Sequence, residues 1–297
     1  MKLRFILIVF GSLVITNAYA QETYNIQAGL QYGKLSNDDK LSQTSMIVNG
    51  AYYLKPINID QSQPFMEIDF LQKANNFSVQ YGFIKNEDST FASTTVNPLG
   101  ISGTFYVDNF AFGASTSSWG STNFTLKSNT LSYVGIKSTT NDFNIGYFVT
   151  PTTLISYINS KDNTIYTPST ELAAIKDSKK TKNSVNSHTV MSFGGPRFLV
   201  VDLSYGQIKS TQTKSETNKE YSAKFRYYPE VKYFFEGGYT SNSGGKAGDK
   251  GKTQLFSAGY SFTPRFAVML SNEHFSGDVS AEKSSNTSTI LTAGYRF

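Results

Sequence analysis

The chain has 297 residues, of which 14% are aromatic, and it contains 19 Tyr and 23 Phe but no cysteine. The lack of cysteine excludes a disulfide framework, a thiolate metal site and a lipid anchor on an N-terminal cysteine. The formal net charge of +5 is too small a basic excess to indicate a nucleic-acid-binding protein. After residue 20, no apolar run approaches the roughly 18 residues that a membrane helix needs.

The first 20 residues are typical of a secretory signal peptide. Lys2 and Arg4 provide the charged start, residues 5–14 form an apolar run, and an A-x-A cleavage site ends at Ala20. Loss of the two basic residues lowers the net charge from +5 to +3. We therefore expect an exported protein with a signal peptide at residues 1–20 and a single domain over residues 21–297.

Apolar and polar residues alternate through most of the remaining chain. For example, Tyr221, Ala223, Phe225 and Tyr227 alternate with Ser222, Lys224, Arg226 and Tyr228. A period of two is typical of a β-strand with one apolar face, whereas a helix needs apolar residues three and four apart. The alternation predicts an all-β fold. A membrane barrel fits this composition because only alternate residues face lipid, and an exported soluble β protein is the alternative.

Short turns and long polar stretches alternate between the expected strands. The short turns are at residues 108–109, 150–153, 194–196, 229–231 and 263–265; the long stretches are at residues 36–43, 86–97, 120–129, 161–183, 209–219, 241–252 and 277–288. This layout is typical of a transmembrane antiparallel β-barrel with short periplasmic turns and long extracellular loops. Taking residues 130–149 as one strand gives 14 strands, and a different division of that segment leaves 12 or 16 open.

Three segments resemble bacterial outer-membrane porins. Residues 52–56 (Tyr-Tyr-Leu-Lys-Pro) followed by residues 64–71 resemble an early hairpin of a family of general bacterial porins, in which a Tyr-Tyr strand end precedes a Pro-x-x-Glu-x-x-Phe-Leu stretch. Residues 146–151 resemble a strand-into-turn phrase of that family and of other barrels. The ending with Tyr295 and Phe297 resembles the C-terminal strand that the β-barrel assembly machinery reads. Thr292 departs from this pattern, because many such strands carry glycine there.

Charged residues opposite the apolar stripes are the candidates for lining a pore. They are Lys224 and Arg226 on one strand, Asp202 and Glu236 on its two neighbours, Glu67 and Asp69 in the early hairpin, and Arg296 near the C-terminus. Opposed charges across a lumen would select ions, whereas pairing between adjacent strands would make the same charges structural. The lysines of residues 161–183 would face lipopolysaccharide phosphates if external, would narrow the pore if folded inward, or would simply form a solvated charged loop. With their positive charge at the pore mouth, the candidates predict a weak preference for anions.

The two histidines do not indicate a catalytic site. His188, near Ser187 and Ser192, and His274, next to Glu273, lack the nucleophile–base spacing that barrel hydrolases need. Two histidines without cysteine leave no metal-ligand cluster, and the glycine-rich residues 244–252 lack the phosphate-loop spacing. We therefore expect no catalytic residue, no metal and no cofactor.

These observations together predict a Gram-negative outer-membrane porin for passive diffusion of small hydrophilic solutes. Its channel would be narrow, because eight-strand barrels are filled by side chains and barrels of 16 to 18 strands are open. Its expected partners are outer-membrane lipid, lipopolysaccharide and the β-barrel assembly machinery, with no nucleic acid, and a homo-oligomer remains open. The alternatives are a non-conducting barrel that acts as an adhesin or structural protein, and a barrel hydrolase that uses His188 or His274.

Overall fold

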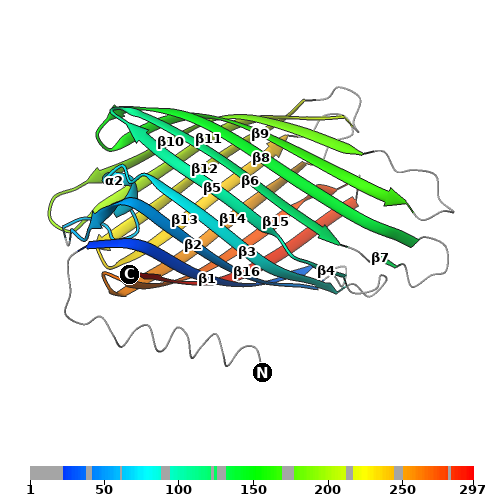
Figure 1. Ribbon diagram of the computed structural model, residues 1–297, viewed down its shortest axis with the longest axis horizontal. Helices are drawn as coiled ribbons and strands as arrows, with labels where there is room; N and C mark the ends of the chain where they lie inside the picture. Colours follow the sequence, from blue (N-terminus) through cyan, green and yellow to red (C-terminus); the bar gives the residue numbers. More distant parts are fainter. Residues whose placement is uncertain are drawn as a thin grey trace.

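The computed structural model describes residues 23–37, 42–60, 62–87, 94–121, 124–125, 132–168, 177–211, 217–243, 250–279 and 282–297. These residues form a closed antiparallel β-barrel of 14 long strands, which confirms the predicted fold and strand count (Figure 1). The expected signal peptide lies outside the described residues. Among the described residues, no helix is long and apolar enough to cross a membrane.

The long strands follow one another around the barrel in chain order. They are β1 (Thr23–Asn37), β2 (Ser42–Asn58), β3 (Asn76–Glu87), β5 (Leu99–Val107), β6 (Phe110–Ser121), β8 (Ser132–Thr150), β9 (Thr153–Pro168), β10 (Ser178–Ser192), β11 (Phe198–Ser210), β12 (Thr217–Glu230), β13 (Tyr233–Ser243), β14 (Lys250–Thr263), β15 (Phe266–Val279) and β16 (Glu282–Arg296). Two short strands, β4 (Thr94–Val96) and β7 (Phe124–Thr125), pair with β3 and β8. One four-residue helix, α2 (Ile68–Leu71), lies between β2 and β3.

The barrel closes between its first and last strands. The β1–β16 ladder runs from the pair Gln27 and Arg296 to the pair Asn37 and Asn286. Two further backbone bonds include the last residue: the Phe297 N–H donates to the Ile26 carbonyl oxygen at 2.7 Å, and the Asn25 N–H donates to the Phe297 backbone oxygen at 3.1 Å. Both ends of the described chain therefore lie at the same rim, as an even number of strands requires (Figure 1).

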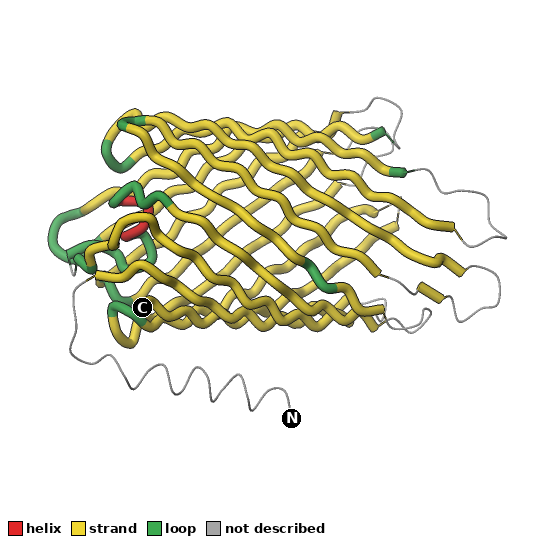
Figure 2. The backbone as a smooth tube through the Cα atoms, in the orientation of Figure 1, coloured by secondary structure: helices red, strands yellow, loops and turns green. Residues whose placement is uncertain are grey.

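Five short connections also meet at that rim, which we call the short-turn rim (Figure 2). They join β5 to β6, β8 to β9, β10 to β11, β12 to β13 and β14 to β15, as the sequence predicts. Most of the opposite connections are shorter than predicted, although the one between β6 and β8 is not. In particular, the expectation of a loop over residues 161–183 is wrong, because β9 continues to Pro168 and β10 begins at Ser178.

The lysines of that stretch consequently belong to the barrel wall. Lys161 lies on β9, and Lys179, Lys180 and Lys182 lie on β10, where Lys182 pairs with Glu220 of β12 at 2.6 Å. Lys176 falls outside the described residues. The start of β10, residues 178–184, is polar on each face, and β9 carries only Ile165 and Tyr166 as large apolar or aromatic residues after Lys161; hydrogen bonds between strands do not depend on apolar side chains. The alternation of apolar and polar residues therefore stops before the strands themselves end.

The apolar stripes face outward. Phe225 and Leu203 are 51% and 48% exposed, whereas the alternate residues face the lumen. Tyr24 is the exception, because the β1–β2 ladder shifts register between Tyr24 and Ile26. Tyr24 is only 1% exposed and points inward, while Ile26 remains on the outer face.

The buried core lies inside the barrel at the short-turn rim, where the β2–β3 connection folds inward. We call its residues 62–75 the inward segment; it carries α2 (Figure 1). Phe65 and Ile68 of this segment pack with Tyr24, Tyr53, Ile57 and Ala74 in one buried cluster. Phe70 and Leu71 pack against a second cluster on the opposite wall, made of Val190, Phe198, Val200, Tyr228 and Phe234. The segment therefore spans the lumen and contacts walls on both sides.

Candidate functional site: the inward segment and the lumen

Glu67 fixes the inward segment to the wall through three side chains. Its carboxylate accepts hydrogen bonds from the Arg226 guanidinium at 2.5 Å and the Tyr228 hydroxyl at 3.0 Å, and it lies 3.5 Å from the His188 ring. Burial alone would raise the pKa of Glu67, but the nearby His188 ring and the charge of Arg226 hold it below its ordinary value. Glu67 therefore remains a buried anion.

Arg226 connects this anion to a second one on the wall. Its guanidinium also binds the carboxylate of Glu236, with a nitrogen–oxygen distance of 2.5 Å, and it lies 4.9 Å from the ring centroid of Phe234. Arg226 and Glu236 are direct ladder partners on β12 and β13. Arg226 and Glu236 therefore pair between adjacent strands, as the alternative of structural charges predicted. Because Arg226 also binds Glu67, the same arginine connects this pair to the inward segment.

His188 links the segment to two further strands. Its Nδ1 lies 2.5 Å from the carboxylate of Asp202, the ladder partner of His188 on β11, and its ring lies 4.2 Å from that of Phe70. No hydroxyl among the described residues hydrogen-bonds to this ring. The arrangement makes His188 a bridge between two carboxylates rather than a base beside a nucleophile. His274 lies elsewhere on an exposed position, 3.2 Å from Thr287.

Asp69 provides a second attachment on the other side of the barrel. It accepts short hydrogen bonds from the hydroxyls of Tyr24 on β1 and Tyr53 on β2. Both tyrosines are almost fully buried, and their rings contact each other edge to face with centroids 5.5 Å apart. Glu67 and Asp69, predicted near a turn at the pore wall, therefore hold the inward segment from two sides.

Lys224 stands apart from this network. It is exposed on the lumen side of β12, opposite its ladder partner Asp202, which instead contacts His188. No ion pair involving Lys224 occurs in the described part of the chain. Asp202, the predicted partner of Lys224, is thus bound to His188, for which the sequence predicted no pairing.

Arg296 and the terminal aromatic residues lie at the same rim. Arg296 faces inward and donates to the carbonyl oxygen of Phe65 at 2.7 Å, so the last strand also holds the inward segment. Tyr295 and Phe297 contact each other with ring centroids 4.7 Å apart. Their role in assembly stays a prediction.

Beyond the inward segment, small polar side chains cover the lumen wall. On β3, β5, β6 and β8, two adjoining hollows of about 230 and 170 Å³ share Ser102, Ser115 and Asp142 in their walls. Ser78 and Ser102 are 2.5 Å apart, and Ser115 donates to Asp142 at 2.7 Å. The wall therefore presents hydroxyl and carboxylate groups to whatever occupies the lumen.

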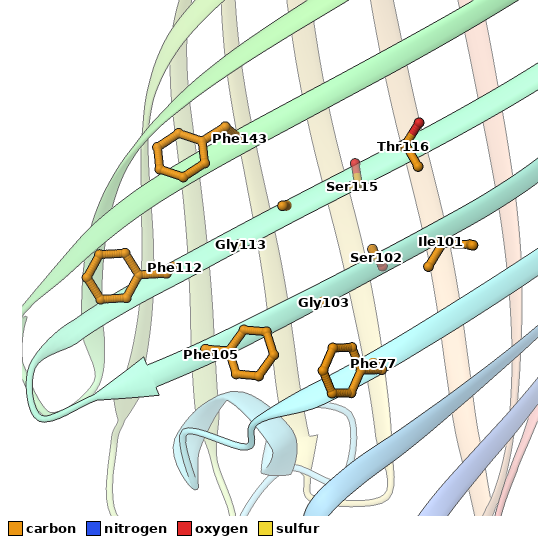
Figure 3. A pocket seen from close by; sticks show the side chains of 11 residues that line it. Phe77, Ile101, Ser102, Gly103, Phe105, Phe112, Gly113, Ser115, Thr116 and Phe143 are labelled. Atoms are coloured by element: carbon orange, nitrogen blue, oxygen red, sulfur yellow. The ribbon is translucent and has the colours of Figure 1, made fainter.

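The outer face of the same strands is apolar. A depression of about 440 Å³ lies over Gly103 and Ala114, bounded by Phe77, Phe105, Phe112 and Phe143 (Figure 3). Phe77 and Phe143 are 48% and 53% exposed. This contrast between two faces of one sheet is what a lipid-facing wall around a polar lumen requires.

No family model and no curated protein sequence matches the chain. Several solved structures share its fold. The outer membrane protein Omp33 of Acinetobacter baumannii superposes with a TM-score of 0.58 at 15% identity, covering 94% of this chain and 100% of that one. The toluene transporter TbuX of Ralstonia pickettii gives a TM-score of 0.56 at 10% identity, covering 92% and 90%, and the monoaromatic hydrocarbon channel CymD gives 0.56 at 10%, covering 94% and 89%.

At these identities the likeness shows the fold alone. It shows an outer-membrane type of β-barrel fold and identifies no particular porin family.

Proposed function

We propose that this chain is an outer-membrane channel for passive diffusion, and that its solutes are small and hydrophilic. The observation that carries the proposal is the pairing of an apolar outer face with a lumen wall of hydroxyl and carboxylate groups. Solved barrels of similar fold include channels and transporters. The apolar face would contact outer-membrane lipid, the short-turn rim would face the periplasm, and residues 1–20 would direct export.

The lumen wall favours hydrophilic solutes over hydrocarbons. The neighbours TbuX and CymD are a toluene transporter and a hydrocarbon channel. Here, however, the hollows bounded by Ser78, Ser102, Ser115 and Asp142 offer hydrogen-bonding groups. Ser78 pairs with Ser102 and Ser115 with Asp142, and the remaining donor and acceptor positions of these groups would stay unmet beside a hydrocarbon. A hydrophilic solute would satisfy them.

A second candidate is a non-conducting barrel with an adhesive or structural role. The observation that favours it is the inward segment, which touches both walls and buries Phe65 and Ile68 inside the barrel. In the channel proposal the same segment narrows the lumen at the periplasmic end. The assembly machinery and lipopolysaccharide are proposed partners in both cases.

Solute flux separates the two candidates. Purified, refolded protein in liposomes should let small sugars such as arabinose enter and cause swelling, with rates that fall steeply for larger sugars. Swelling no faster than in protein-free liposomes would contradict the channel. Uptake of toluene with exclusion of arabinose would instead assign the barrel to hydrocarbon transport.

A further inference from the structure

A crevice remains between the inward segment and one sector of the wall. It measures about 80 Å³ and is lined by Met66 of the segment and by Gln27, Asn49, Thr292, Gly294 and Arg296 of the wall. The charge network of Glu67 holds the segment to β10, β12 and β13, and Asp69 holds it to β1 and β2. The crevice lies in the sector of β15, β16 and β1, where Met66 is 36% exposed.

Some of the inward-facing residues in this sector of the wall have small side chains or none, which leaves space beside the inward segment. Gly294 and Gly29 are ladder partners on β16 and β1, and Ala267 follows on β15. A Cβ atom at Gly294 would meet only the Ala28 carbonyl oxygen, at 3.8 Å, so that a larger side chain could enter the crevice. A larger side chain introduced at position 294 should therefore fill the crevice.

Arg296 brings a buried positive charge to the crevice. It is 6% exposed, donates to the carbonyl oxygens of Phe65 and Pro264 at 2.7 and 3.2 Å, and lies over the Tyr24 ring. Its Nε has no hydrogen-bond partner, and no ion pair with a carboxylate occurs within the described residues. Arg226, by contrast, is paired with two carboxylates. Buried charges in proteins are normally paired, whereas Arg296 brings to the crevice a positive charge that no carboxylate of the described residues pairs by a salt bridge.

We propose that this crevice is the passage by which solutes pass the inward segment, that Met66 sets its width, and that Arg296 contacts small anions there. The inference rests on the proposed channel function. The anion would be one small enough to enter a crevice of about 80 Å³ beside the Arg296 guanidinium, such as chloride or a small carboxylate.

Single-channel conductance in potassium chloride tests the passage. Met66→Trp and Gly294→Leu should each lower the conductance about twofold or more by narrowing the path. Gly237→Leu is the matched control, because a Cβ there meets nothing within 4 Å and Gly237 shares the outward face with its ladder partner Phe225. A conducting wild type whose conductance is unchanged by Met66→Trp and by Gly294→Leu would overturn the passage alone. A wild type that does not conduct would overturn the channel function as well.

Reversal potentials in a salt gradient test the anion contact. Arg296→Gln should lower the chloride-to-potassium permeability ratio about twofold or more. With acetate in place of chloride, the acetate-to-potassium permeability ratio should also fall. Since Arg296 also holds the segment, a second measurement uses Met66→Cys, the sole thiol in a chain without cysteine. A negatively charged thiosulfonate adduct should lower the anion preference more than a positively charged adduct of similar size. Equal selectivity with both adducts would overturn the contact.

Discussion

Replacing Glu67 by glutamine is the most informative perturbation of the inward segment. The change keeps the side chain's size but removes the charge that faces Arg226, Tyr228 and His188. A hydrogen bond to a charged group contributes about 1.5–3 kcal/mol. Breaking a buried ion pair completely costs about 3–5 kcal/mol. Arg226 keeps its ion pair with Glu236 at 2.5 Å when Glu67 is replaced, so we use the smaller range for a single hydrogen bond to a charged group.

We therefore expect the segment to be released more easily by about 2 kcal/mol, or about 30-fold in the ratio of open to closed states. Ala74 reports on this equilibrium, because it is 6% exposed and packs in the cluster that holds the segment. In an Ala74→Cys background, Glu67→Gln should raise the rate of thiol labelling about 30-fold where labelling requires opening.

Lys224→Gln is the matched control in the same background. It removes a lumen charge from β12 that forms no ion pair within the described residues. Its labelling rate should equal that of the background. Equal labelling rates for Glu67→Gln and Lys224→Gln would refute the idea that the charge network holds the segment.

Three further predictions concern the membrane face, assembly and pH. Phe225→Arg should cost about 2–4 kcal/mol of barrel stability near the bilayer midplane, whereas Ser222→Arg on the lumen side should be tolerated far better; equal folded yields would show that the faces are misassigned. Deleting Phe297 should lower the amount of heat-modifiable barrel in the outer membrane without reducing export, and unchanged barrel levels would contradict an assembly role. Because the pKa of Glu67 is lowered in the folded state, its contribution is complete above its ordinary value of 4.5 and is lost as the pH falls through the lowered value. Larger conductance steps should therefore appear only in strongly acidic solution and should depend less on pH in Glu67→Gln, and a wild type indifferent to acid would argue against this.

The sequence predicts the barrel wall well because lipid and lumen impose a period of two on the strands. Residues such as Phe225 and Leu203 are placed on the correct face by alternation alone. Strand ends are harder to predict, because the wall beyond the apolar band is polar on both faces. Lys179 and Lys182 therefore look like loop residues but belong to β10.

The inward segment was not predicted, although its sequence carries a signal. Phe65, Ile68 and Leu71 are three residues apart, a helical spacing in a region otherwise expected to be a hairpin. The partners of Glu67 could not be derived in the same way. His188 and Tyr228 approach it across the lumen, and such contacts depend on the register of distant strands. The inward turn of Tyr24 depends on an irregularity in the ladder that has no marker in the sequence.

The proposed channel function requires that the barrel conducts past its inward segment. The most direct test is a planar-bilayer recording of the purified, refolded wild-type protein. We predict discrete, small conductance steps, because the remaining crevice beside Met66 is only about 80 Å³. Bilayers that contain folded barrels and yet show no steps above the lipid background would contradict the channel and favour a closed structural barrel.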